Sequence, residues 1–239
     1  MKYLYGPIKS RRLGTSLGIN LTSYKTCSFN CVYCQLGKTN NLTVSRSEYI
    51  KIDEIFDELR VWFDNHKEDL AGLGYITISG SGEPTLNTKI SDLINQIRKI
   101  SSLKIAVITN SSLLADASLR REILGVDLIV PSLDAVTQEL FVKVNRPHQA
   151  IKVDDIIKGL IALRREFRGK IWLEVMLVKS LNDDIRHIRK LKEAIDRINP
   201  DKIQINSPVR TPSEEGVFSV AKSKLKKIKD ILGDKAEII

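Results

Sequence analysis

Three cysteines, Cys27, Cys31 and Cys34, lie within eight residues of one another, and the 239-residue sequence holds no other cysteine. An odd number of closely spaced thiols is a poor disulfide framework, so the spacing favours a metal centre. Structural zinc takes four ligands, and the three histidines lack the paired spacing that would supply them. Three soft thiolates instead suit a [4Fe–4S] cluster that keeps one iron open to a ligand from outside the protein.

A second polar element, Gly80-Ser81-Gly82-Glu83, directly follows an apolar run that is typical of a strand. Glycines let the backbone approach a ligand closely, and a carboxylate can balance the charge of a buried ammonium group. An ordinary turn between a strand and a helix, with Glu83 near the start of the helix, gives the same pattern. Both interpretations stay open at this point.

The elements that position these residues are predicted from apolar runs that alternate with helical periodicity. The predicted strands cover residues 17–21, 75–78, 104–108, 127–130, 170–178 and 202–205. The predicted helices cover about 52–63, 90–97, a stretch that ends near 124, 156–163, 185–198 and 219–232. The cysteine loop therefore follows the first strand, and the glycine element follows the second.

This alternation predicts an α/β fold with a parallel sheet, because its strands are apolar throughout and are linked by helices. Six such units can form a partial barrel or a doubly wound sheet, and periodicity does not decide between them. Either arrangement places the site at the carboxyl ends of the strands. We expect a single domain over residues 1–239, with a core at about 15–208 and extensions at 1–14 and 219–232.

The segment Cys27-Ser28-Phe29-Asn30-Cys31-Val32-Tyr33-Cys34, with an aromatic residue before the last cysteine, resembles the signature of the radical S-adenosylmethionine superfamily. The glycine element resembles the Gly-Gly-Glu element of that superfamily, with Ser81 in place of one glycine. The segments at 10–14 and 144–148 resemble those of a poorly characterised iron–sulfur oxidoreductase branch, which is related to the archaeal wybutosine-type tRNA enzymes. The resemblance implies a partial (β/α)6 barrel with parallel strands.

The resemblance also implies two cofactors, a [4Fe–4S] cluster on the three cysteines and S-adenosylmethionine. In this superfamily the methionine end of S-adenosylmethionine chelates the open iron, and an electron from the cluster yields methionine and a 5′-deoxyadenosyl radical. The residues implied to contact this cofactor are Tyr33, Gly80, Gly82, Glu83, Asn110, Ser132, Asp134 and Asn206. The short polar residues among them can also be helix caps or turn residues.

Arginines stand at several of the segments that carry the resemblance or near them. They are Arg11, Arg12, Arg46, Arg146 and Arg210. Such residues are commonly exposed or ion-paired, although an arginine at a strand end can bind a carboxylate or phosphate bidentately. Both roles stay open for each of them.

The net charge of +9 favours an acidic partner such as nucleic acid, although many of the lysines fall on predicted helix faces where solvation is the usual role. No run approaches the ~18 apolar residues of a membrane span, so we expect a cytoplasmic protein without a membrane partner. With all three cysteines on one cluster, these residues hold no thiolate for a second cluster and no catalytic thiol.

The expected function is that of an oxidoreductase-like enzyme that cleaves S-adenosylmethionine reductively and takes hydrogen from a small molecule, RNA or protein. Its expected partners are that substrate and an electron donor such as ferredoxin or flavodoxin. The alternative is a module that holds a cluster or zinc and binds RNA or senses redox state, without radical chemistry. Metal analysis of protein purified without oxygen separates these two functions.

Overall fold

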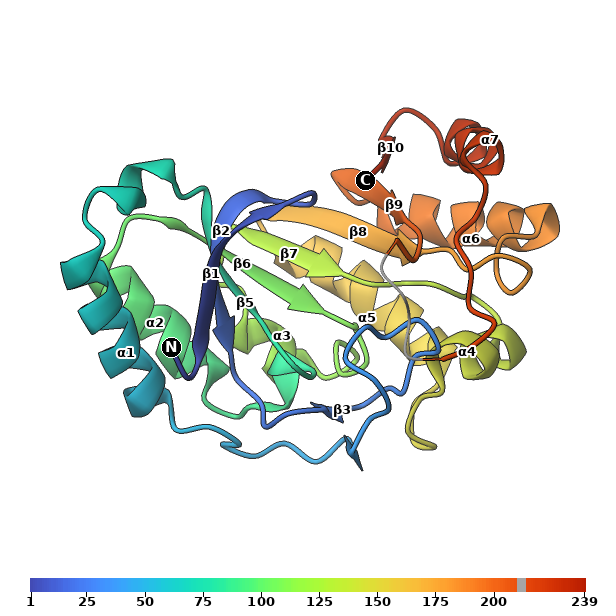
Figure 1. Cartoon of the computed structure of the whole chain (residues 1–239). Coiled ribbons are helices and arrows are strands. Elements are labelled where there is room, and N and C mark those ends of the chain that lie inside the picture. Colours follow the sequence, from blue (N-terminus) through green and yellow to red (C-terminus); the bar gives the residue numbers. More distant parts are fainter. Residues whose placement is uncertain (210–213) are drawn as a thin grey trace.

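The fold is organised by one twisted sheet whose strands follow one another in chain order (Figure 1). This computed structural model describes residues 1–209 and 214–239. β1 pairs antiparallel with β2, and each later pair of neighbours is parallel. The strands of this sheet are β1 (Leu4–Ser10), β2 (Gly14–Asn20), β5 (Tyr75–Ser79), β6 (Lys104–Thr109), β7 (Leu128–Pro131), β8 (Lys170–Met176), β9 (Lys202–Asn206) and β10 (Ala236–Ile238).

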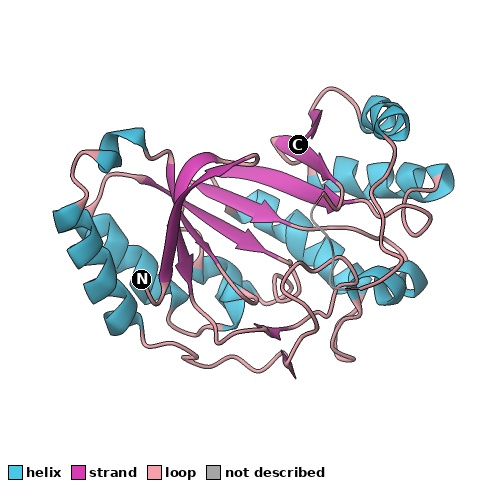
Figure 2. Cartoon of the chain, in the orientation of Figure 1, coloured by secondary structure: helices cyan, strands magenta, loops and turns pink. Residues whose placement is uncertain are grey.

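Helices connect the strands and lie outside the curve of the sheet (Figure 2). They are α1 (Ile52–Asn65), α2 (Ile90–Ile100), α3 (Ala117–Glu122), α4 (Gln138–Asn145), α5 (Val153–Glu166), α6 (Ile185–Ile198) and α7 (Lys222–Leu232), with short 3-10 helices η1 (Asp69–Gly72) and η2 (Pro84–Leu86). Across the described ranges, no helix has both the length and the apolar composition that crossing a membrane requires.

The strand order decides between the two arrangements that the sequence left open. Right-handed crossovers between strands that follow chain order all pass on the same face of the sheet, whereas a doubly wound sheet reverses direction. The sheet therefore has the curvature and connectivity of a partial barrel, and in the described residues β1 and β10 form its open edges. The predicted partial (β/α)6 barrel is confirmed, and the six predicted strands are β2 and β5 to β9.

Several elements differ from the predictions. β1 contains Gly6 and Pro7, which weaken a strand pattern and are tolerated here because β1 is an edge strand. β10 is too short to show an alternation of apolar and polar residues, so the sequence did not predict it. The same is true of β3 (Thr26–Cys27) and β4 (Asn41–Leu42), which pair with each other in a separate sheet. The eight-residue helix α4 was not predicted either. The fifth predicted strand ends at Met176 instead of residue 178. The C-terminal helix begins at Lys222 instead of residue 219, because Ser219 pairs with Val178 in an isolated bridge.

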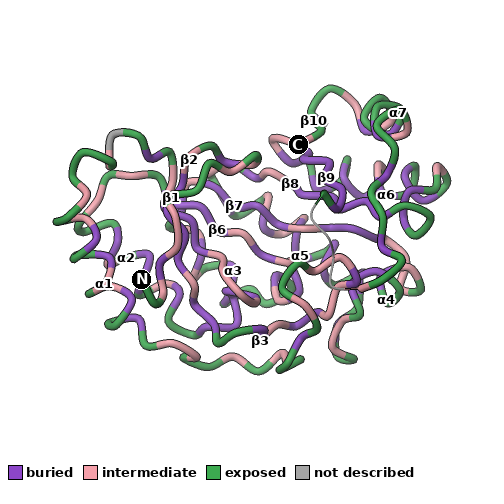
Figure 3. Tube along the Cα trace, viewed as in Figure 1, coloured by how far each residue is buried: buried purple, intermediate pink, exposed green. Residues whose placement is uncertain are grey.

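The main core lies between the outer face of the sheet and the helices (Figure 3). In α2, the periodic residues Ile90, Leu93, Ile94 and Ile97 are all buried, as their spacing predicted. Burial of each such side chain contributes roughly 1.5–3 kcal/mol. Packing on the outer face therefore holds the strands in place and leaves their inner face available for other contacts.

The turn between β1 and β2 closes one end of the inner face. The hydroxyl of Ser10 accepts hydrogen bonds from the backbone N–H groups of Arg12 (3.1 Å) and Leu13 (3.4 Å). Leu13 packs with Ala106 and Leu128, which belong to a small apolar cluster apart from the main core. Since Leu128 begins β7, the turn covers the amino end of the half barrel. The carboxyl ends of the strands remain as the place for a site.

Candidate active site

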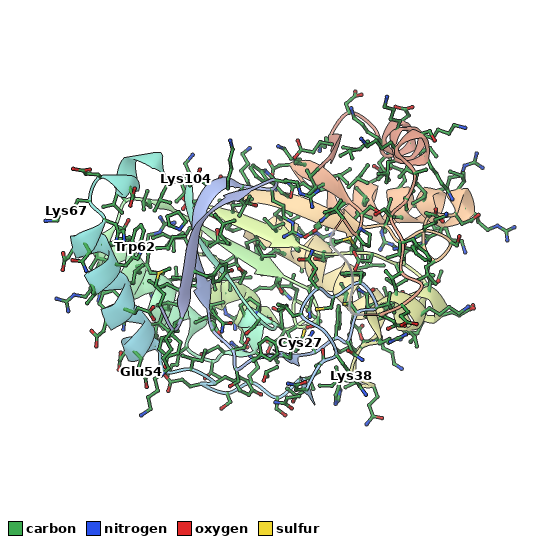
Figure 4. All side chains as sticks on the ribbon, viewed as in Figure 1. Cys27, Lys38, Glu54, Trp62, Lys67 and Lys104 are labelled. Carbon is green, nitrogen blue, oxygen red and sulfur yellow. The ribbon has the colours of Figure 1, made fainter. Side chains whose placement is uncertain are left out.

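A cavity of about 630 Å³ lies at the carboxyl ends of β5, β6 and β7, beside the cysteine loop. The predicted residues in its wall are Cys27, Tyr33, Cys34, Gly80, Gly82, Glu83, Asn110 and Ser132. Figure 4 shows Cys27 close to the strand ends and Lys38 of the same loop at the periphery. The fold therefore brings most of the predicted residues to one place, whereas Cys31, Asp134 and Asn206 are not part of this wall.

The cysteine loop is held in place by α4. The backbone N–H of Val32 donates to the carbonyl of Val144 near the end of this helix (3.0 Å). The ring of Phe29 packs edge-on against that of Phe141, with 5.3 Å between the ring centroids. Because Phe29 and Val32 stand on either side of Cys31, these contacts fix the middle of the cysteine motif. The helix that the sequence pattern missed thus orients the predicted ligands.

Each cysteine sulfur receives a nitrogen donor from a different part of the chain. The pairs and their nitrogen–sulfur distances are Asn110 and Cys27 (3.5 Å), Asn145 and Cys31 (3.5 Å), and Lys25 and Cys34 (3.0 Å). Hydrogen bonds to sulfur and nearby charge are among the factors that set the reduction potential of an iron–sulfur cluster. Sequence reasoning missed Lys25 and Asn145, because no pattern within the chain shows which side chains will reach the sulfur atoms.

Cys27 and Cys31 lie in surroundings that favour the protonated form of their thiols. Burial raises the pKa of Cys27 to about 11, and the charge of Glu83 adds to this effect. Burial, followed by the charge of Asp134, raises the pKa of Cys31 further still. Reactive cysteines have lowered pKa values instead. A positively charged metal centre would stabilise these thiolates, so the site suits metal ligands better than a nucleophile.

The donor set also fits a cluster. Three thiolates from one loop are ligands that a [4Fe–4S] cluster uses, each through a different iron. In the parts of the chain at 1–209 and 214–239, no three His, Cys, Asp or Glu residues are grouped so that one metal ion could bind them. Cys27, Cys31 and Cys34 would hold such a cluster, which would supply one-electron chemistry at the cavity.

Glu83 is buried, and its carboxylate accepts four hydrogen bonds. Oε1 accepts from the backbone N–H (3.1 Å) and the hydroxyl (2.6 Å) of Thr85 and from the hydroxyl of Thr109 (2.7 Å). Oε2 accepts from the backbone N–H of Asn110 (2.7 Å). Burial raises the pKa of Glu83, and these hydrogen bonds oppose that change. The residue both caps η2 and lines the cavity, so the two sequence interpretations are compatible.

The glycines of this element allow two close backbone contacts. Gly80 has a φ of +106°, and a Cβ atom there would lie 2.1 Å from Oδ1 of Asn20. A Cβ atom on Gly82 would lie 1.9 Å from the carbonyl oxygen of Thr26, the residue before Cys27. Larger residues would therefore push the loop after β5 away from the strand that carries the first cysteine.

Asp134 lies behind the wall of the cavity and holds other residues in position. Its carboxylate accepts hydrogen bonds from the hydroxyl of Tyr33, the side-chain amide of Asn145 (2.7 Å) and the backbone N–H of Met176 (2.9 Å). Burial raises the pKa of Asp134 to about 6. The carboxylate thus links the cysteine loop, α4 and β8, and it fixes the Tyr33 ring that lines the cavity.

The last two predicted residues occupy different places. Ser132, at the end of β7, is in the cavity wall, and its backbone N–H donates to the carbonyl of Thr109 (3.0 Å). Asn206, at the end of β9, lines an adjoining cavity instead. Its side-chain amide donates to Glu174 (2.9 Å), so this asparagine belongs to a polar group on the inner face of β8 and β9.

Four of the five arginines make ion pairs or hydrogen bonds within the protein. The ion pairs, with their nitrogen–oxygen distances, are Arg12 and Glu174 (2.5 Å), Arg46 and Glu122 (2.8 Å), and Arg146 and Glu214 (2.5 Å). Arg11 donates to the carbonyl of Ile239 (3.0 Å) and to Asn206 (3.4 Å). Arg210 lies outside the described residues. The first pair lies at a cavity, because Arg12 is part of its wall and Glu174 is buried.

A Lys25→Met variant is expected to lower the reduction potential of the reconstituted cluster by roughly 60–130 mV. This range corresponds to a charge-assisted hydrogen bond of about 1.5–3 kcal/mol for a one-electron couple. The sign follows because the ammonium group favours the more negative, reduced state. A redox titration followed by electron paramagnetic resonance measures the shift, and Lys25→Arg, which retains the charge, serves as the control. An unchanged potential at full iron content would show that the amine does not act on the cluster.

Comparison with known proteins places this geometry in a family. The model of the Radical SAM superfamily matches residues 21–191, a range that includes the cysteine loop and the glycine element. "GTPase Obg" of Brachyspira hyodysenteriae is 39% identical over 228 residues, which make up 95% of this chain and 33% of that protein. A UPF0026 protein of Methanocaldococcus jannaschii is 38% identical over 217 residues, 90% of this chain and 66% of that protein. The chain thus spans a third to two thirds of these relatives.

Solved structures agree on the fold. A radical SAM methyltransferase from Sphaerobacter thermophilus matches with a TM-score of 0.72 at 16% identity, over 99% of this chain and 68% of that one. Structures of other neighbours contain S-adenosylmethionine or a [4Fe–4S] cluster. By the family match over residues 21–191, this chain belongs to the radical S-adenosylmethionine superfamily, whose enzymes use these two cofactors for radical chemistry.

Proposed function

We propose that this protein cleaves S-adenosylmethionine reductively and removes a hydrogen atom from a substrate, as an oxidoreductase-like enzyme. With a cluster held by Cys27, Cys31 and Cys34, the bound cofactors would supply one-electron reductive cleavage of a carbon–sulfur bond of S-adenosylmethionine, with methionine and a 5′-deoxyadenosyl radical as products. A hydrogen atom would then move from a C–H bond of the substrate to the 5′ carbon. The observation that supports this function best is the cavity of about 630 Å³ that the cysteine loop shares with three consecutive strand ends.

Each residue of the site has a proposed role. Cys27, Cys31 and Cys34 hold the cluster. Glu83 faces the ammonium group of the cofactor, with the backbone at Gly80 and Gly82 close to the methionine end. The remaining proposed contacts, to adenine and ribose, come from Tyr33, Asn110, Ser132, Asp134 and Asn206. Of these, Asp134 contributes through its hydrogen bond with the Tyr33 hydroxyl, and Asn206 through the adjoining cavity.

The chain itself orients the cofactor and limits access of water. Four hydrogen bonds hold the Glu83 carboxylate in one orientation before any ligand binds, which reduces the cost of ordering it. The turn that carries Leu13 covers the amino end of the half barrel. A reactive radical needs such shielding, because quenching by solvent competes with transfer to substrate.

The proposal predicts that the dithionite-reduced protein forms 5′-deoxyadenosine and methionine from S-adenosylmethionine even without substrate. The rate should be low, because the radical is then quenched by buffer or solvent. Chromatography of both products measures this reaction, and a sample without dithionite is the control. A protein with a full, reducible cluster that binds S-adenosylmethionine but forms neither product, even with cell extract added, would instead be a binding module without radical chemistry.

Partners and setting follow from the same chemistry. We propose a one-electron donor of the ferredoxin or flavodoxin type, because the three cysteines leave no thiolate for a second cluster in this chain. We also propose a cytoplasmic location, where the reducing environment keeps clustered thiols available for iron. Finally, we propose that residues 1–239 act as one domain, which is supported by the single large sheet that joins β1 to β10.

A further inference from the structure

A second cavity, of about 270 Å³, lies on the inner face of the half barrel next to the proposed cofactor cavity. The two cavities share wall residues, so they adjoin. The shared residues are Tyr5, Arg12, Gln35, Ser79 and Ile108. A molecule in the smaller cavity would therefore lie beside one in the larger cavity. This is the position that a substrate needs if it is to meet a radical formed from the cofactor.

The smaller cavity is positively charged. Lys9, Arg11 and Arg12 line it, and no acidic residue belongs to the part of its wall that the structure describes. Of these three basic residues, Arg12 pairs with a carboxylate, that of Glu174, which is not part of the described wall. One buried carboxylate against three basic side chains leaves an excess of positive charge. Such an excess within a concave pocket favours an anion.

Two guanidinium groups on one turn supply most of this charge. Arg12 contacts Glu174 through its Nη2 atom at 2.5 Å, which fixes the plane of its guanidinium group. Arg11, the residue before it, is exposed and also lines the cavity. A guanidinium group can bind a carboxylate or phosphate bidentately, so Arg11 is the residue best placed to hold an anion here.

We propose that this smaller cavity binds the anionic group, a carboxylate or phosphate, of a small-molecule substrate. This inference rests on the proposed function, since it places the substrate beside the cofactor. At about 270 Å³ the cavity lies just below the roughly 300–1,000 Å³ of typical ligand pockets, so it would hold the charged end of a small molecule. A macromolecule would need an extended exposed surface, whereas all described wall residues except Gln35 and Val209 come from the strands of the sheet and the turn between β1 and β2.

Equilibrium dialysis with radiolabelled phosphate and radiolabelled succinate tests this proposal on the cluster-loaded protein without S-adenosylmethionine. We expect at least one probe to bind, and we expect Arg11→Gln to weaken its binding roughly tenfold, as the loss of one charge-assisted contact implies. The probe that binds more tightly distinguishes the phosphate source from the carboxylate source. Arg60→Gln is the matched control. This substitution makes the same change in net charge, and Arg60 is exposed on α1, away from the cavity wall.

Arg12→Lys provides a second variant that keeps a charge against Glu174 but removes the planar guanidinium group from the cavity wall, and it should also weaken binding. The proposal would be overturned if both probes bound equally to wild type, Arg11→Gln and Arg60→Gln. It would also be overturned if an RNA oligonucleotide bound tightly and Arg11→Gln alone abolished that binding. Because the measurement omits S-adenosylmethionine, it does not depend on cofactor cleavage. A failure of the proposed radical reaction is therefore distinguishable from a failure of the anion site.

Discussion

A Cys31→Ala variant should purify as a folded protein that retains almost none of the roughly four irons of the reconstituted wild type. Two thiolates cannot hold a four-iron cluster in a defined position, and Cys31 is the proposed ligand at the centre of the loop that α4 fixes. Formation of 5′-deoxyadenosine should fall by more than ~100-fold, since even changes next to metal ligands cost 10–100-fold. The same result is expected for Cys27→Ala and Cys34→Ala.

Iron and sulfide analysis, the visible absorption spectrum and product chromatography measure these losses. Lys38→Ala is the matched control, because Lys38 lies in the same loop, is exposed, and should leave iron content and cleavage unchanged. The circular dichroism spectrum reports whether the fold survives, which we expect because Cys27 and Cys31 are only partly buried and pack at the margin of the main core. Full turnover in the three cysteine variants, or retention of activity with zinc in place of iron, would disprove the cluster assignment.

Glu83→Gln should weaken S-adenosylmethionine binding by about tenfold to over a hundredfold while iron content stays at the wild-type level. The change removes the negative charge that faces the proposed ammonium position and keeps the shape of the side chain. A charge-assisted hydrogen bond contributes about 1.5–3 kcal/mol, which corresponds to this range of affinity. Calorimetric titration of the cluster-loaded protein with S-adenosylmethionine gives the dissociation constant.

Glu83 also caps η2, so its replacement is expected to cost some stability that is unrelated to ligand binding. Asp116→Ala provides the comparison, because Asp116 caps α3 through a hydrogen bond from the backbone N–H of Ser118 (2.7 Å) and is not part of the cavity wall. Asp116→Ala should lose about 0.5–2 kcal/mol of folding free energy. Only Glu83→Gln should lose affinity, and equal affinities in the two variants would mean that Glu83 is simply a helix cap.

The sequence predicted the cysteine ligands, the glycine element and the parallel strands because each of these is a local pattern. It did not predict which side chains meet across strands. Asp134 and Asn206 were both expected at the cofactor on the basis of their position after a strand, yet the fold puts Asp134 behind Tyr33 and Asn206 in the adjoining cavity. Which way a residue points just beyond a strand depends on register and on the next turn, and neither leaves a periodic signal.

The contact between Lys25 and Cys34 could not be predicted from the sequence for a second reason, which is the way the loop closes. The Nζ atom of Lys25 reaches Cys34 although the two residues are separated by most of the cysteine loop. Lys25 adopts a left-handed backbone conformation with a φ of +56°, and its carbonyl accepts hydrogen bonds from the N–H groups of Asn40 and Asn41. These contacts close the loop on itself. Loop closure of this kind comes from many weak preferences, so no single residue type reveals it.

The turn between β1 and β2 combines two tasks within three consecutive residues. Leu13 packs against the inner face of the sheet, whereas Arg11 and Arg12 extend into the smaller cavity. The turn joins the antiparallel edge strand to the sheet, so none of its three residues contributes to the main core between sheet and helices. Substitutions at position 11 can therefore alter ligand preference with little effect on folding, whereas position 12 must also balance the buried charge of Glu174. A family built in this way can diversify its substrates through one hairpin tip while the cofactor machinery stays constant.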